Sequence, residues 1–413
     1  MFRNKLTFRN LCIASAIVVI LKIVYIVFFH KEFWAVEDFT IATNIVKYHE
    51  YSQFIKQGPT AYKLPVYPVC ISFFLELFGD SGLMALSVFQ AVLSFFSPLL
   101  IYKILELFEK KVVGILAGFL FILSPSYFIY PTIIEATNIF VPLLLLWFFC
   151  YFSIWFLKKE KTVHYVSLGL LTGVLFLTQV VIVPLAMMML LALLFFKKAT
   201  WQKFSVLMIV LCLIYSPWVV RNYFIFDQLV LSKTPAWQNV YVGFTANNQL
   251  FDDLKLISVE RDNFLYGMSD EVSELEMEKV YKNEVAKETQ WEPIFFIKKA
   301  ISNFICLWYV PPKYFYDNSI SVLLGRKIPV LIFNVLTIPS LLLIFRRNKM
   351  LFWFSILFFG NFTMPYLIGH AANIRFKLDF EWYQLILVAI IMIEIYNRLT
   401  KKRILERCAS RII

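Results

Sequence analysis

The chain has 413 residues, of which 60% are hydrophobic and 18% aromatic, and its mean hydropathy is +0.70. A soluble protein of this length needs a far more polar surface, so the composition excludes one and indicates a polytopic membrane protein. The formal net charge of +12 does not indicate nucleic-acid binding, because the basic residues lie in short clusters between apolar runs, as in cytoplasmic loops.

Ten apolar segments come close to the roughly 17–25 residues that a helix needs to cross a bilayer. The first lacks a small-residue cleavage site, so we expect a span there and not a signal peptide. The segments 163–179 and 181–196 form a tight hairpin that turns at Thr178, Gln179 and Pro184. The ten segments are 11–29, 82–108, 112–131, 137–157, 163–179, 181–196, 204–220, 328–345, 350–368 and 381–397.

The segment 64–78 is shorter and carries Pro65 and Pro68, which favours an interfacial or re-entrant helix over a crossing. Charge supports this choice, because a crossing there would place the later basic clusters outside. With ten spans both termini face the cytoplasm and every short basic cluster lies on that side. These clusters are Arg3/Lys5/Arg9, Lys110/Lys111, Lys158/Lys159/Lys161, Lys197/Lys198/Lys203, Arg346/Arg347/Lys349 and the tail 398–411.

We therefore expect one polytopic, all-α membrane domain over residues 1–413, with two long stretches on the opposite, extracytoplasmic side. The first, 30–80, holds an acidic pair and the short juxtamembrane helix. The second, 221–327, predicts a charged helix from Met268 to Thr289 and, after Pro293, an interfacial amphipathic helix with Lys298 and Lys299. No glycine-rich phosphate loop, HExxH or GxSxG motif occurs, so ATP-driven chemistry and zinc or serine hydrolysis lack support.

Charged residues from four distant parts of the chain are expected at the outer membrane level. Ionisable groups near hydrocarbon are unfavourable, so residues of this kind are expected to have a function. A carboxylate can take a proton from a hydroxyl as general base, and arginines can bind a phosphate and stabilise its charge as it leaves. Together they suit transfer of a sugar from a lipid phosphate to a hydroxyl. The residues are Glu37, Asp38, Glu135, Arg221, Arg375 and Lys377.

Several motifs along nearly the whole chain resemble one family in their order and spacing. They are Glu37-Asp38 after the first span, Lys63-Leu64-Pro65-Val66-Tyr67-Pro68 before a short helix ending at Phe78-Gly79, Glu135 after a Ser-Pro span, Ser216-Pro217-Trp218-Val219-Val220-Arg221-Asn222-Tyr223, Gly243 with Asn247-Asn248, Trp291-Glu292-Pro293, Leu307-Trp308, and Arg375-Phe376-Lys377-Leu378. The chain resembles the GT-C type integral-membrane glycosyltransferases, specifically the bacterial relatives of protein O-mannosyltransferases and lipid A aminoarabinose transferases.

The resemblance implies a polyprenyl-phosphate-sugar donor, inversion at the anomeric carbon and extracytoplasmic catalysis, with the catalytic acid in the first outer loop. We expect an enzyme of a bacterial inner membrane whose acceptor is a hydroxyl of a lipid-linked glycan, of lipid A or its core, or of a protein. Asp38 is expected as the base, with Glu37 orienting the acceptor or binding Mg²⁺ or Mn²⁺. The residues expected to bind the donor phosphate are Arg375, Arg221, Lys63 and Lys377. The residues expected to support the site are Glu135, Tyr67 and His370.

The chain departs from the family pattern at several positions. Ala42 and Val46 stand four and eight residues after Asp38, where tyrosine and alanine are common. Gln179 replaces a frequent basic residue, and Asp379 follows Lys377-Leu378 where proline is usual. These departures leave the choice between Asp38 and Glu37 as base open.

Alternatives remain for the residues and for the function. Glu135 is equally suited to cap the following helix, and Arg221 and Arg375 to anchor the chain at lipid headgroups. A transporter or flippase for lipid-linked glycans is the main rival, which predicts mid-bilayer charges, broken helices and inverted repeats. Lys22 lies mid-span, and no repeat is visible. A polymerase or ligase acting on undecaprenyl-diphosphate glycans is a closer enzymatic alternative.

Overall fold

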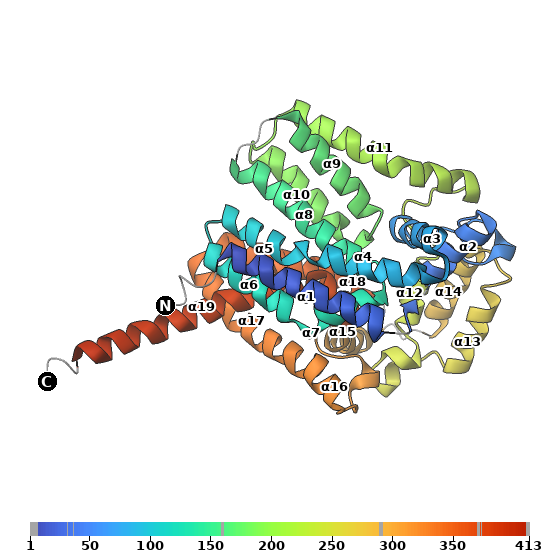
Figure 1. Cartoon of the computed structure of the whole chain (residues 1–413). Coiled ribbons are helices and arrows are strands. Elements are labelled where there is room, and N and C mark those ends of the chain that lie inside the picture. The colour runs from blue at the N-terminus through green and yellow to red at the C-terminus, as the bar shows by residue number, and fades with distance from the viewer. Residues whose placement is uncertain are drawn as a thin grey trace.

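The structure is a computed structural model that describes residues 7–30, 32–35, 37–157, 161–288, 292–369, 372 and 374–409. His370 and Trp291, which the sequence analysis singled out, lie outside the described residues. The chain is overwhelmingly helical (Figure 1). One short parallel pair of strands, β1 (Trp34–Ala35) and β2 (Ile133–Ile134), joins the two segments that precede the expected acids. The expected all-α class is confirmed.

All ten apolar segments are helical where the structure describes them. The first half of the chain forms α1 (Phe8–Phe28), α2 (Glu37–Tyr48), α3 (Val66–Phe78), α4 (Gly82–Ser94), α5 (Phe96–Leu107), α6 (Lys111–Leu123), α7 (Pro125–Ile129), α8 (Thr137–Leu157), α9 (Thr162–Phe176), α10 (Val183–Phe195) and α11 (Trp201–Phe226). The second half forms α12 (Trp237–Val242), α13 (Val259–Met268), α14 (Glu274–Glu288), α15 (Pro293–Trp308), α16 (Ile320–Val322), α17 (Ile328–Arg347), α18 (Lys349–Ile368) and α19 (Leu378–Ala409).

The expected count of ten crossings is not confirmed. By length and hydropathy, six helical runs of the described chain can cross a membrane, or seven if the pair Lys111–Leu123 and Pro125–Thr132, bent by 60°, counts as one span. The hairpin helices α9 and α10 have 15 and 13 residues, fewer than the roughly 20 that a bilayer core requires. The hairpin thus accounts for part of the difference.

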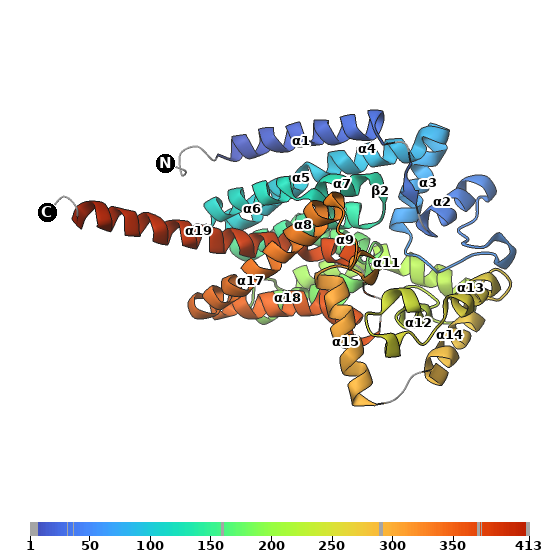
Figure 2. The same ribbon diagram turned by 90° about the horizontal axis from the view of Figure 1, so that it is seen from below.

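The long helices run roughly side by side, and the polar segments gather at one end of them (Figures 1 and 2). α2, α3 and α12–α14 lie at this end, whereas α1 begins and α19 ends at the other. The largest hydrophobic core is formed between the long helices and includes the fully buried Phe140, Trp147 and Phe358. Lys22, in the middle of α1, donates to the hydroxyl of Ser94 at 2.9 Å and so links α1 to α4.

α3 is the expected short helix, and it folds back against α4. The turn between them begins at Gly79, whose φ is +54°. A Cβ atom on Gly82 would lie only 2.8 Å from the Cα of Leu75 and from the carbonyl oxygen of Phe74. The close approach therefore depends on glycine at the first position of α4.

The stretch between α11 and α15 has a small core of its own. Met277, Tyr281 and Val285 are spaced four residues apart on α14 and are all buried, so this charged helix has one apolar face. The predicted helix Met268–Thr289 was wrong at its start, because α13 ends at Met268 and the chain turns before α14 begins at Glu274. On α15, Lys298 is paired with Asp253, whereas Lys299 is buried.

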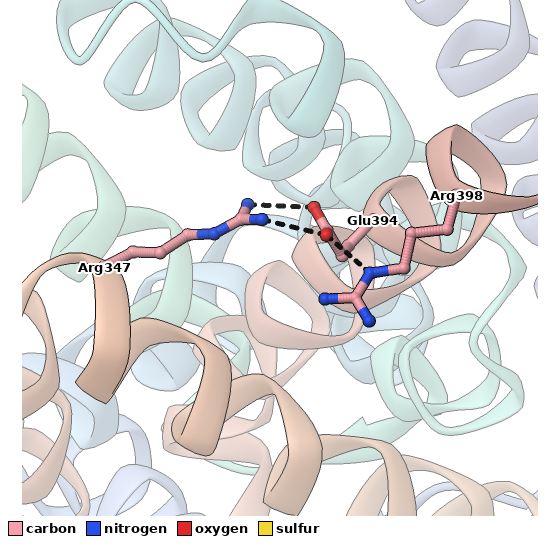
Figure 3. A network of polar contacts seen from close by, with 3 residues as sticks. All are labelled: Arg347, Glu394 and Arg398. Atoms are coloured by element: carbon pink, nitrogen blue, oxygen red, sulfur yellow. Dashed lines mark hydrogen bonds and ion pairs between the residues drawn. The ribbon is translucent and has the colours of Figure 1, made fainter. Parts of the chain in front are cut away.

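The end of α17 is tied to α19 by an ion-pair network. Figure 3 shows Glu394 between Arg347 and Arg398. Arg347 donates to both carboxylate oxygens at 2.9 Å, and Nε of Arg398 donates at 2.8 Å. Such bidentate pairing is stronger and more directional than a single contact between flexible side chains. The network thus fixes the two helices relative to each other at the end where the chain leaves the bundle.

Candidate active site

A cavity of about 530 Å³ lies where α2 and α3 meet the stretch that follows α11. This volume is within the roughly 300–1,000 Å³ typical of small-molecule sites. Its wall combines five charged side chains with carboxamides and tyrosines from segments far apart in the sequence. The charged residues are Asp38, Lys63, Glu135, Lys233 and Arg375, and the polar ones include Tyr62, Tyr67, Gln179, Gln238, Asn239, Asn248, Asn361 and Tyr366.

Asp38 reaches the cavity from the first turn of α2. Its side chain is 7% exposed. Glu37 is the first residue of the same helix, so both acids are at the end where the helix dipole stabilises negative charge. Ala42, one turn further on, is fully buried in a small core with Tyr67 and Ala136. The position at which the chain departs from the family pattern is therefore a packing position here.

The strand pair brings the second acid to the first. Trp34 pairs with Ile133 and Ala35 with Ile134, in parallel. Because both chains leave the pair in the same direction, α2 with Asp38 and the segment with Glu135 emerge side by side. The carboxylate of Glu135 forms an ion pair with Arg375 at 2.5 Å. This contact joins the end of β2 to the turn η10 (Ile374–Lys377).

A buried bond supports the same junction from behind. Asp379 is 2% exposed and accepts a hydrogen bond from the hydroxyl of Thr137 at 2.7 Å. Thr137 lies two residues after Glu135, and Asp379 four residues after Arg375. The aspartate that stands where the family usually has proline thus fastens the two segments that carry the ion pair.

Tyr67 connects α3 to the rest of the site. Its hydroxyl donates to Oε1 of Gln90 at 2.6 Å, and Nε2 of Gln90 donates to the carbonyl oxygen of Pro131 at 2.9 Å. The ring is 1% exposed although its edge lines the cavity. Tyr67 therefore positions the wall by joining α3, α4 and the segment before β2.

Two lysines enter the cavity from neighbouring segments. The Nζ atom of Lys63 lies 5.4 Å from the ring centroid of Tyr62. The backbone carbonyl oxygen of Lys63 accepts a hydrogen bond from the hydroxyl of Tyr51 at 2.9 Å. Lys233 follows α11, and the next residue, Thr234, donates its backbone N–H to Ala61 at 3.1 Å. Lys233 was not predicted from the sequence. The signal in the sequence is that Lys233 is the only charged residue between Asp227 and Asp252.

Two expected phosphate-binding residues are placed behind the wall, and neither is among the residues that line the described cavity. The guanidinium of Arg221 donates to the carbonyl oxygens of Thr60 at 2.6 Å and Tyr51 at 3.4 Å. Lys377 is fully buried and donates to Asn334 Oδ1 at 3.0 Å. Burial lowers the pKa of Lys377 to about 8.

Carboxamides form much of the remaining wall. Gln179 and Asn248 were named from the sequence, whereas Gln238, Asn239 and Asn361 were not. Asn361 on α18 donates to the carbonyl oxygen of Val181 at 2.8 Å and accepts from the N–H of Leu185 at 3.2 Å. It thereby holds the hairpin turn that brings Gln179 to the cavity. Gln238 and Asn239 come from α12. Such groups donate and accept hydrogen bonds without charge, as hydroxyl-rich ligands require.

No group of three His, Cys, Asp or Glu side chains close enough to hold a metal ion occurs in the part of the chain that the structure describes. Mg²⁺ usually takes one or two protein carboxylates and completes its coordination with water and phosphate oxygens. A metal ion held by Asp38 in this way stays a prediction.

Comparison with known proteins supports the expected resemblance. Residues 59–220 match the family of dolichyl-phosphate-mannose-protein mannosyltransferases. The archaeal oligosaccharyltransferase AglB from Archaeoglobus fulgidus, in complex with an inhibitory peptide and a dolichol-phosphate, is 16% identical with a TM-score of 0.52, covering 96% of this chain and 51% of that one. The same organism's oligosaccharyltransferase, tethered to an acceptor peptide with the NVT sequon, is 16% identical with a TM-score of 0.55. The match covers 98% of this chain and 51% of that one.

ArnT from Cupriavidus metallidurans bound to undecaprenyl phosphate is 12% identical with a TM-score of 0.42, covering 92% of this chain and 76% of that one, which is too slight a likeness to add to the argument. No curated protein matches the chain in sequence. The chain spans about half the length of the oligosaccharyltransferases, and at these identities the likeness establishes the fold. The protein is thus an integral membrane protein with the fold of the GT-C type glycosyltransferases, as its sequence motifs predicted.

Proposed function

We propose that the protein is an inverting glycosyltransferase that moves a sugar from a polyprenyl-phosphate donor to a hydroxyl of an extracytoplasmic acceptor. One observation carries the proposal: a buried carboxylate, Asp38, shares one cavity with the cations Arg375, Lys63 and Lys233. The match to mannosyltransferases that use dolichyl-phosphate-mannose, and the dolichol-phosphate in the AglB structure, support a lipid phosphate as the donor's carrier.

In this proposal Asp38 is the general base. It takes the proton of the acceptor hydroxyl while the hydroxyl oxygen attacks the anomeric carbon from the face opposite the phosphate. The bond from the anomeric carbon to the phosphate oxygen breaks, and its electron pair stays on the phosphate. A single displacement of this kind inverts the anomeric configuration. Burial in a cavity strengthens the electrostatic interactions of the carboxylate with the reacting groups.

The cations are proposed to bind the donor phosphate. The phosphodiester carries one negative charge, and the leaving monoester gains a second near neutral pH because its second pKa is about 6. Cations already held in place stabilise the charge that develops in the transition state. Arg375 is held by Glu135, and Lys63 by its carbonyl bond to Tyr51. Arg221 and Lys377 would support these residues from behind, without contact to the phosphate.

Transfer by the purified protein tests the proposal directly. The donors are a panel of polyprenyl-phosphate sugars and the acceptor is a membrane extract. We expect Asp38→Asn to lower kcat by about 100-fold or more, because general-base catalysis contributes about 10²–10⁴-fold. Asp80→Asn is the matched control, since Asp80 is an exposed acid in the turn between α3 and α4, and it should leave kcat unchanged.

The same assay decides between the two neighbouring carboxylates. Glu37→Gln is expected to keep kcat within about tenfold of the wild type, because its role would be to orient the acceptor rather than accept its proton. Loss of transfer in Glu37→Gln with full transfer in Asp38→Asn would make Glu37 the base. Transfer that survives both substitutions would remove the acidic pair from the mechanism.

A further inference from the structure

The loop between α2 and α3 reaches the cavity through the segment Thr60–Lys63, which is held on two sides. From α11, Arg221 donates to the carbonyl oxygen of Thr60 at 2.6 Å. From α14, the carboxylate of Glu274 accepts the hydroxyl of Thr60 and, at 3.1 Å, the backbone N–H of Ala61. Ala61 is fully buried. The segment is thus clamped between charged groups of two helices that are distant in the sequence.

The clamped residues also set the position of the second lysine. The carbonyl oxygen of Ala61 accepts the N–H of Thr234 at 3.1 Å, and Lys233 immediately precedes Thr234. Lys63 lies two residues after Ala61. A displacement of Ala61 therefore moves both lysines of the cavity wall, and with them the spacing of the positive charges that a phosphate would meet.

Glu274 itself lies one layer behind that wall. It lines a separate space of about 20 Å³ that shares Tyr62, Pro235 and Gln238 with the main cavity. A space of this size holds about one water molecule, so it offers no room for a sugar or a phosphate. Glu274 is thus placed to act on the main cavity through Thr60 and Ala61.

We infer that Glu274 is a positioning residue for the donor: through Thr60 and Ala61 it sets the spacing of Lys63 and Lys233 and so the affinity for the lipid phosphate. The inference rests on the proposed function. By this inference α14, which is outside the catalytic cavity, holds the segment Thr60–Lys63 in position.

The environment of Glu274 makes this role dependent on pH. Burial raises the pKa of its carboxyl to about 7, although the bonds from Thr60 and Ala61 and the charge of Arg221 oppose the rise. An ionised carboxylate forms stronger hydrogen bonds than a neutral carboxyl. The clamp is therefore strongest above pH 7, and the KM for the donor should fall as pH rises through 7. The groups facing Glu274 are Arg221 on α11, Tyr51, Thr60 and Tyr62 in the loop, Tyr266 on α13 and Tyr281 on α14.

Steady-state transfer with two variants tests the inference. Glu274→Ala removes both bonds, and we expect the KM for the donor to rise about tenfold, as loss of hydrogen bonds to a charged group implies, with kcat within about threefold. Glu274→Gln keeps an acceptor for Ala61 and a donor for Thr60, so its KM should be near that of the protonated wild type and should no longer change between pH 6 and pH 8. The matched control is Glu271→Gln, an exposed acid just before α14.

Inhibition by undecaprenyl phosphate gives a second readout, because it reports phosphate binding without turnover. Its inhibition constant should rise with the KM in Glu274→Ala. An unchanged KM and inhibition constant in a folded Glu274→Ala would overturn the inference while the transferase proposal stands. The inference also fails if Glu274→Ala lowers kcat and the thermal midpoint but leaves the KM for the donor unchanged, because that result indicates a purely structural effect. If the wild type neither transfers from any donor nor binds undecaprenyl phosphate, the proposed function falls as well.

Discussion

The net charge of the cavity wall suits an anionic ligand. Glu135 and Arg375 neutralise each other across their ion pair, which leaves Asp38 with Lys63 and Lys233. The remaining excess of one positive charge matches the single negative charge of a phosphodiester. Charge complementarity of this kind favours the right ligand and disfavours cationic ones. The ion pair also keeps the Arg375 guanidinium in one orientation, as tight phosphate recognition requires.

Arg375 and Glu135 are expected to behave as a coupled pair. Arg375→Ala should raise the KM for the donor by about tenfold or more, because it removes a cation and leaves Glu135 without this partner. Glu135→Gln should have a smaller effect. In a double-mutant cycle with Glu135→Ala, the combined effect should be smaller than the sum of the single effects. Strict additivity in donor KM would show that the pair does not act as a unit.

Lys299 gives a stability prediction whose sign depends on pH. It is 1% exposed, and burial lowers its pKa to about 7 although its ammonium lies over the ring of Phe244. An unfolded lysine keeps its proton up to about pH 10.4. Between pH 7 and that value the unfolded state binds more protons, so the stability of the folded state rises with pH.

Lys299→Met should therefore raise the thermal unfolding midpoint more at pH 7 than at pH 9. Lys298→Met is the matched control, since Lys298 is on the same helix and forms a solvent-exposed pair with Asp253. That control should change the midpoint little at either pH, because exposed pairs contribute about 0–1 kcal/mol. Equal shifts for Lys299→Met at both pH values would contradict the lowered pKa.

Among the elements, α3 and α4 depend on their glycine contact. A Cβ at Gly82 would meet backbone atoms of Leu75 and Phe74, which cannot move without displacing α3 and with it Tyr67. We expect Gly82→Ala to destabilise the fold by about 1–3 kcal/mol, the usual cost of overpacking, and to lower transfer activity. Thermal unfolding in detergent and the transfer assay measure the two effects.

Gly267→Ala in α13 is the control for this substitution. Apart from its chain neighbours and the backbone of its own helix, no heavy atom of the described residues lies within 4 Å of the Cβ that it would introduce, so the same chemical change meets open space. Replacing a helical glycine with alanine there should be neutral or stabilise by about 0.5–1 kcal/mol. A destabilisation equal to that of Gly82→Ala would show that the close contact of α3 with α4 is not the cause.

For the whole molecule, the cavity is lined in part by α2, α3 and α12. These helices lie at the end of the bundle opposite to the start of α1 and the end of α19 (Figures 1 and 2). From the positive-inside rule we expect Lys110 on the cytoplasmic side and α14 outside. In intact cells an impermeant maleimide should label Glu271→Cys and not Lys110→Cys, both of which are exposed positions. The wild type supplies the background from native cysteines. External labelling of Lys110→Cys would invert the proposed topology.

The helices were largely predictable because they depend on local properties. An apolar run must form a helix in a membrane to satisfy its backbone hydrogen bonds, and this holds whatever the rest of the chain does. The short helix ending at Phe78 follows from the same local pattern, whereas α2 was not predicted, because the sequence placed Glu37 and Asp38 in an outer loop. The start of α14 was missed because the turn before Glu274 interrupts a run of charged residues with no glycine or proline to mark it.

The sequence by itself determined the helical membrane class. It also predicted that Asp38, Glu135 and Arg375 lie at one level, as it did for Arg221 and Lys377, and the resemblance added Lys63 and Tyr67. Only the tertiary structure decided which polar groups meet. The strand pair aligns Asp38 with Glu135, and the bond from Thr234 to Ala61 brings Lys233 to the same cavity as Lys63. Loop carbonyl oxygens hold Arg221 behind the wall, where Lys377 is buried. These contacts join segments far apart in the chain, and no local pattern encodes them because they arise from packing between whole helices.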